Sequence, residues 1–208
     1  MPRLMDMGLI RLQNAIVDMA NLAQQSVMKA IEAYAKGERI TQEALNRANE
    51  LSMLATEVEE LAVELLARYQ PVATDLRFIK SCLEIAYGFS RFGRYAYDIA
   101  QVLEIYGDLS GCDKSVVQDL SIKVTNMIQT SIQSFKTRDE KLARSLRQDD
   151  DQVDNIYLQY NKQLSQGKAI PIRCALASAL VLRYLERIAD HACYIGDSVV
   201  YITTATKI

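Results

Sequence analysis

The sequence predicts an all-α protein made of two tandem three-helix bundles. Apolar residues recur three and four positions apart over long segments, the spacing of a helix with one buried face, rather than alternating as in a strand. Only three prolines interrupt the 208 residues, so long helices meet few breaks. Half of the residues are apolar and 24% are charged, the balance of a globular protein.

The first half of the chain contains three predicted helices separated by segments that break helices. The first helix is predicted over 4–36, and the segment KGERIT follows it. In that segment, Thr41 is expected to be the N-cap of a second helix over 41–69. The segment YQPVATD then leads into a third helix over 74–106.

The second half repeats this order after the segment YGDLSGCDK at the middle of the chain. Three more helices are predicted, over 114–136, 139–166 and 170–204, with breaks at KTRDE and SQGKAIP. Pro171 opens the last helix as Pro71 opens the third, which indicates an internal duplication.

The two halves also align with each other, residues 90–100 lying over 186–196. Two three-helix bundles side by side would bury an apolar face in each half with a single sequence pattern. We therefore divide the chain into a first repeat, 1–108, and a second repeat, 109–208.

The charge balance excludes a strong general attraction to nucleic acid. The chain has 24 basic and 26 acidic residues and a formal net charge of −2. Its longest uncharged stretch, 124–135, is too short to cross a membrane, and the start, MPRLMDMG, lacks the apolar region of a secretory signal. We therefore expect a cytoplasmic protein with no direct nucleic-acid partner.

The cysteines show no metal-binding or redox spacing and lie in apolar helical surroundings. We expect all four to be small buried thiols rather than metal ligands or disulfide partners. They are Cys82, Cys112, Cys174 and Cys193.

Acidic residues interrupt the apolar stripe of the helix predicted over 139–166. Helical spacing calls for an apolar residue between Leu146 and Val153, and Asp149 or Asp150 stands there instead. Asp154 follows Asp150 one turn later on the same side of the helix. The equivalent stripe in the second helix of the first repeat has no such interruption.

The last helix carries one polar stripe on an otherwise apolar surface. If this helix and the one before it are antiparallel neighbours, its acids Glu186 and Asp190 lie at the same height as Asp150 and Asp154. The full stripe consists of Arg183, Glu186, Arg187, Asp190, Tyr194 and Asp197.

Carboxylates gathered at a half-buried seam repel one another and require a positive partner. One alternative is ion pairing with Arg183 and Arg187, which stand three residues before Glu186 and Asp190. The other is a metal ion such as Mg²⁺, Mn²⁺, Ca²⁺ or iron, which carboxylate oxygens suit. The spacing alone leaves both open.

The sequence gives little support to a catalytic metal site or to a phosphate-binding site. A ferritin-type di-metal oxidase needs Glu-x-x-His pairs, whereas the single histidine, His191, stands five residues after Glu186 and is expected to be a packed helix residue. Near Pro71, Asp75 is expected to cap the third helix and Arg77 to pair locally, in preference to binding phosphate. We expect no enzymatic activity.

Three segments resemble the PhoU family of phosphate-transport regulators. They are QPVATDLRFI (70–79), DDQVD (150–154) and RYLERIADHACYIGDSVVYI (183–202), and the resemblance extends over nearly the entire chain. It implies a fold of two three-helix repeats.

The resemblance also implies metal ligands. The family pattern of an acid, three intervening residues and an Asp falls on Asp150 and Asp154 and on Glu186 and Asp190, and implies bound iron or other divalent ions. In the first repeat the matching positions carry other residues, so we expect metal in the second repeat only. Those positions are Ala48, Asn49, Ser52, Ser90 and Arg94.

The function implied is regulation of phosphate uptake and of phosphate-starvation signalling, with an indirect negative effect on transcription. The expected partners are subunits of a phosphate ABC transporter and a sensor histidine kinase, reached by docking of helix faces, with contact to the membrane only through them. We also expect a homodimer. The alternative is a non-catalytic accessory protein of another membrane transporter, without a kinase partner.

Overall fold

The computed structural model describes residues 4–167 and 169–206, which form six α-helices and no strand. Every predicted helix is present, with ends within two residues of those expected. The predicted break at 165–171 includes Lys168, which lies outside the described residues. The helices are α1 (Leu4–Lys36), α2 (Thr41–Tyr69), α3 (Ala73–Tyr106), α4 (Ser115–Thr137), α5 (Glu140–Ser165) and α6 (Ile172–Thr204).

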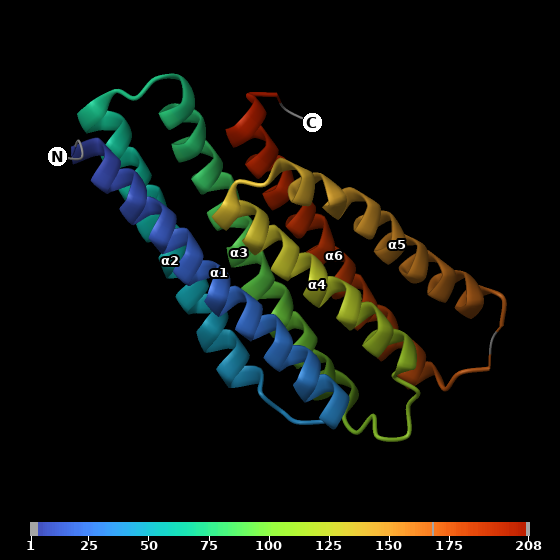
Figure 1. Ribbon diagram of the computed structural model, residues 1–208. Helices are drawn as coiled ribbons and strands as arrows, with labels where there is room; N and C mark the ends of the chain where they lie inside the picture. Colours follow the sequence, from blue (N-terminus) through green and yellow to red (C-terminus); the bar gives the residue numbers. More distant parts are fainter. Residues whose placement is uncertain (1–3, 168, 207–208) are drawn as a thin grey trace.

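The helices form two three-helix bundles that meet along their central members. Helices α1, α2 and α3 pack on one another, as do α4, α5 and α6, and the two sets touch through α3 with α6 and α1 with α4. Figure 1 shows α1 and α4 on one side of the central pair, with α2 and α5 at the flanks. In the described part of the chain, no helix is apolar over a length that would cross a membrane.

Close packing on the central helices depends on small residues. At Gly196 of α6, an added Cβ would lie 2.9 Å from the backbone oxygen of Ala143 and 2.8 Å from Leu146. At Gly93 of α3, it would lie 2.5 Å from a Leu51 methyl carbon. Each glycine therefore lets a flanking helix approach its central helix closely. Gly93 does so for α2 on α3, and Gly196 does so for α5 on α6.

Two expected caps are wrong. Ile40, not Thr41, is the N-cap of α2, and the Thr41 hydroxyl instead hydrogen-bonds Glu104 of α3 at 3.1 Å. Val72 is the N-cap of α3 and has no side-chain cap bond, while Asp75 lies within the first turn. Local pairing of Arg77 is confirmed, since its guanidinium donates to the hydroxyl of Thr74 at 3.1 Å.

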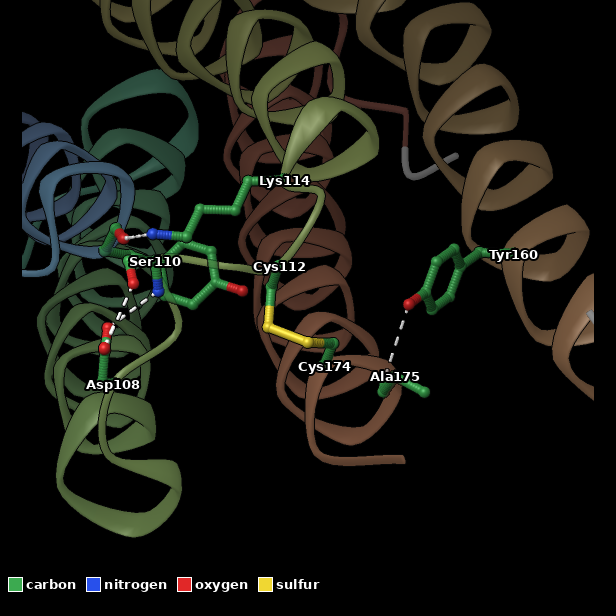
Figure 2. The surroundings of a disulfide bond; sticks show 8 residues. Asp108, Ser110, Cys112, Lys114, Tyr160, Cys174 and Ala175 are labelled. Atoms are coloured by element: carbon green, nitrogen blue, oxygen red, sulfur yellow. Dashed lines mark hydrogen bonds between the residues drawn. A yellow bond between two sulfur atoms is a disulfide. The ribbon is translucent and has the colours of Figure 1, made fainter. Parts of the chain in front are cut away.

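The expectation of four free thiols is also wrong. Cys112, in the connection between α3 and α4, forms a disulfide with Cys174 in the first turn of α6 (Figure 2). The pair is 62 positions apart in sequence and 5.4 Å apart between Cα atoms. The fold brings these residues together, and no local spacing could indicate it. Cys82 and Cys193 are free and buried, as expected.

We predict that Gly196→Ala destabilises the protein. The new methyl group would meet the backbone of α5, which cannot rotate away as a side chain can. Overpacking of this kind costs about 1–3 kcal/mol, more than the gain of at most about 1 kcal/mol in helix propensity from alanine. Urea denaturation followed by circular dichroism measures the change. Gly111→Ala is the control, because nothing lies within 4 Å of an added Cβ there; equal loss in both variants would contradict the prediction.

Candidate carboxylate site between helices α5 and α6

The structure brings together the four acids singled out in the sequence. Asp150 and Asp154 lie on α5, and Glu186 and Asp190 lie on α6, its neighbour in the same bundle. Burial raises the pKa of each of the other three carboxyl groups, and the negative charge of Asp190 raises it further, which places them within electrostatic reach of Asp190. Asp150, rather than Asp149, is the acid that joins this cluster from the interrupted stripe.

Glu186 is the most deeply placed member of the cluster. Only 8% of its surface is exposed, whereas the three aspartates are half-buried. One oxygen of Glu186, Oε2, and one of Asp150, Oδ1, are buried without a hydrogen-bond partner. An unpaired buried oxygen on an acidic group is costly, so this part of the seam favours a cation or a proton.

Two arginines on α6 supply part of the positive charge. Arg183 pairs with Oε1 of Glu186 at 2.6 Å, and Arg187 pairs with Oδ2 of Asp190 at 3.0 Å. Arg183 also lies over the ring of Tyr157 on α5, with its guanidinium 5.6 Å from the ring centre. These are the ion pairs, three residues apart along the helix, that the spacing offered as the alternative to a metal.

The fit to a metal ion is incomplete. Carboxylate oxygens suit a hard cation, and two of them are left unpaired. However, the described residues contain no group of three or more His, Cys, Asp or Glu side chains arranged to hold one. Because Arg183 and Arg187 each engage an oxygen of the cluster, a metal ion would have to compete with them.

Protonation provides a second way to reduce the repulsion. Burial, together with the charges of Asp190 and Asp154, raises the pKa of Asp150 from 3.8 to about 6. Burial is also the main cause of the raised pKa values of Asp154 and Glu186. Asp150 therefore carries a proton in a large fraction of molecules in mildly acidic solution.

His191 does not join the cluster. Its ring lies among three tyrosine rings, with centroids 5.9 Å from Tyr87, 5.9 Å from Tyr95 and 5.5 Å from Tyr194. Burial, reinforced by Arg91, lowers its pKa to about 4, so the imidazole is neutral near pH 7. It is the packed helix residue that the sequence indicated.

The sequence did not reveal a groove between α3 and α6 beside this histidine. The hollow measures about 500 Å³ and is lined mainly by aromatic and aliphatic groups, with Tyr87 and Tyr194 60% and 59% exposed. The polar stripe placed Tyr194 and Asp197 on one face of α6, but nothing indicated that Tyr87 of α3 would face them. Asp197 is paired with Arg147 of α5 at 2.8 Å.

The described residues of the first repeat form no matching cluster at the aligned positions. Arg94 pairs with Asp98 at 3.3 Å and lies over the ring of Tyr97, so neighbouring groups of the same helix balance its positive charge. The Ser90 hydroxyl donates to the backbone oxygen of Tyr87. The remaining positions, Ala48, Asn49 and Ser52, carry no carboxylate.

With the geometry established, comparison with known proteins identifies the family. The family model of the PhoU domain matches residues 16–103 and 117–199, the greater part of both repeats. The chain belongs to the PhoU family. The PhoU resemblance in the three sequence segments is thereby confirmed.

Among PhoU relatives, the phosphate-specific transport system accessory protein PhoU homolog 1 of Methanothermobacter thermautotrophicus is 31% identical over 156 residues, 72% of this chain and 71% of the relative. The PhoU homolog of Aquifex aeolicus, named in the same way, is 29% identical over 193 residues, 90% of this chain and 87% of the relative.

Solved PhoU structures share the six-helix arrangement. The crystal structure of PhoU from Pseudomonas aeruginosa aligns with a TM-score of 0.87 and 27% identity, covering 97% of this chain and 99% of that one. The PhoU structure from Streptococcus pneumoniae aligns with a TM-score of 0.88 at 20% identity, which shows the common fold.

We predict that Asp150→Asn stabilises the protein above pH 6 and has little effect below pH 4. The folded protein binds a proton at Asp150 more readily than the unfolded chain does, so between 3.8 and about 6 the contribution of this group to stability falls as pH rises. The Asp150→Asn variant lacks the buried charge and should be more stable at pH 7 by about 1–2 kcal/mol. This is less than the whole pKa change would give, because the group is partly solvated.

Denaturation midpoints of both proteins across pH 4 to 8 measure this difference. Asp151→Asn is the matched control, since Asp151 is exposed on the same helix. A stability difference between Asp150→Asn and the parent that does not vary with pH would contradict the raised pKa.

Proposed function

We propose that this protein is a cytoplasmic regulator of phosphate uptake and phosphate-starvation signalling that acts by contact rather than by catalysis. The observation that carries the proposal is the PhoU match over both repeats, together with relatives named as accessory proteins of phosphate-specific transport systems. The whole-length likeness to PhoU structures supports it, because docking of a helical protein depends on its overall shape.

The partners proposed are subunits of a phosphate ABC transporter and a sensor histidine kinase, with negative and indirect control of transcription. Long antiparallel helices present broad surfaces that a partner domain can cover. On the α3–α6 seam, exposed Tyr87 and Tyr194 offer aromatic contact area of the kind enriched in protein interfaces. The protein itself is proposed to be a homodimer that reaches the membrane only through these partners.

We predict that the tagged protein recovers phosphate transporter subunits and a histidine kinase from its own cells. Cells grown with and without phosphate would be crosslinked before purification, and the bound proteins identified by mass spectrometry. Cells expressing the tag alone provide the control. Recovery of subunits of a different transporter, with no kinase in either condition, would overturn the phosphate assignment and favour the alternative accessory role.

We further propose that the carboxylate site takes up a divalent or iron ion in the second repeat only. Asp150, Asp154, Glu186 and Asp190 would supply the oxygens, and the ion would neutralise their charge. The unpaired oxygens of Asp150 and Glu186 support this. Since Arg183 and Arg187 hold Glu186 and Asp190, uptake requires these ion pairs to open.

We predict that Glu186→Ala with Asp190→Ala abolishes metal uptake and leaves helicity intact, because the ligands on α6 are removed. The protein would be incubated with Fe(II) or Mn(II), desalted and measured by elemental analysis, with helicity followed by circular dichroism. Asp98→Ala, which removes a half-buried carboxylate of the first repeat, is the control. Arg183→Gln with Arg187→Gln should tighten uptake by freeing two oxygens; equal metal content in all variants would contradict the site.

A further inference from the structure

The disulfide joins two parts of the chain that meet at the boundary between the repeats. Cys112 belongs to the connection between α3 and α4, residues 107–114, which we call the inter-repeat joint. Cys174 lies in the first turn of α6, the central helix of the second repeat. The bond therefore ties the joint directly to a central helix.

Other contacts hold the joint to the remaining helices without the disulfide. Leu109 is 2% exposed and packs in the core. Within the joint, Asp108 accepts hydrogen bonds from the amide and hydroxyl of Ser110 at 2.8 and 3.1 Å. The ammonium of Lys114 donates to the backbone oxygens of Tyr34 and Ala35 at the end of α1, at 3.0 and 3.1 Å. Opening the disulfide would leave these anchors in place and remove the covalent link to α6.

At the start of α6, the disulfide adds a covalent link to weaker contacts. Its N-cap, Pro171, makes no side-chain cap bond. The hydroxyl of Tyr160 on α5 approaches the backbone oxygen of Ala175 at 3.5 Å, the limit of a hydrogen bond (Figure 2). The sulfur bridge is the covalent link between the first turn of α6 and the joint.

The disulfide can be reached from solvent through Cys112. This residue is partly exposed between the exposed residues Gly111 and Asp113. It lines two surface hollows, of about 520 and 300 Å³, whereas Cys174 is 7% exposed and lines only the smaller. Cys112 is therefore the more exposed residue of the pair, which makes its sulfur the point where an attacking thiolate would exchange.

The two free cysteines do not share this access. Cys82 is fully buried and Cys193 is 6% exposed. Burial raises the pKa of both thiols far above their usual range, so they remain protonated and poor nucleophiles. Neither competes for pairing with Cys112 or Cys174.

We propose that Cys112 and Cys174 form a reversible redox site that exchanges with a protein dithiol of the Cys-x-x-Cys type. A thiolate of the reductant attacks the Cys112 sulfur, breaks the bond to Cys174 and forms a mixed disulfide, and the released Cys174 thiolate takes up a proton. The second thiolate of the reductant then attacks its own first sulfur and releases Cys112 as a thiolate, which is protonated in turn. The two protons come from the reductant, which leaves as a disulfide.

Reduction at this site loosens the inter-repeat joint and the first turn of α6 and leaves the bundles folded. The core residues of α3 and α6 do not depend on the bond, since they pack along the whole central seam. The site thus makes the order of one end of the molecule depend on thiol redox state, independently of phosphate.

The test uses the purified full-length protein, equilibrated in dithiothreitol buffers of graded redox poise and labelled with iodoacetamide without denaturant. Peptide mass spectrometry should show Cys112 and Cys174 becoming labelled together on reduction, while Cys82 and Cys193 stay unlabelled. Hydrogen exchange should rise in 107–114 and at the start of α6, with α2 and α3 unchanged. Cys82→Ala, the control, should behave as the parent does.

A Cys-x-x-Cys protein whose second cysteine is replaced by serine should be trapped on Cys112, and Cys112→Ser should abolish the trap. Three results would overturn the proposal. They are full labelling of Cys112 and Cys174 in protein never exposed to reductant, labelling of Cys82 and Cys193 at the same redox poise as the pair, and trapping on Cys174 instead.

Discussion

The contact between α3 and α6 is the constraint on which the rest of the structure depends. Both helices are buried along most of their length and cannot stand alone in water, so each is covered by two helices of its own repeat and by the other central helix. The close approach of Gly88 to Ile195, whose side chain would lie 3.0 Å from an added Cβ, fixes these two helices against each other. Sequence order then places α5 beside α6, and with it the acids of both.

That placement creates an electrostatic problem which the fold resolves only in part. Arg183 and Arg187 satisfy one oxygen each of Glu186 and Asp190, and burial with neighbouring charge raises the pKa of Asp150 to about 6. Ion pairing and protonation act on the same four carboxylates, and the proposed metal ion would compete with both. The charge of the site therefore depends on pH, and under the proposed function it also depends on the available cation, because each of these supplies positive charge to the same oxygens.

Helix positions and the acidic cluster could be predicted because both are periodic features of the chain. The acid at Asp150 in an otherwise apolar stripe marks one face of α5, and the polar stripe through Glu186 marks one face of α6. The short break near Pro171 makes these helices antiparallel neighbours, so the two faces meet. The disulfide and the Tyr87–Tyr194 groove could not be predicted in this way, since they depend on contacts between distant segments whose side chains follow no repeat. The prediction of Thr41 as an N-cap was wrong because its hydroxyl hydrogen-bonds Glu104 of α3 instead of the helix backbone.

Comparison of the two repeats shows which residues the three-helix bundle does not require. The first repeat forms the same three-helix bundle with Ala48 and Arg94 at positions where the second carries acids, and Arg94 is satisfied by Asp98 and Tyr97. The architecture therefore does not require the carboxylates. The buried oxygen of Glu186 that lacks a hydrogen-bond partner carries a cost in folding free energy. Residues that cost stability and are not needed for folding are the ones whose presence a function explains.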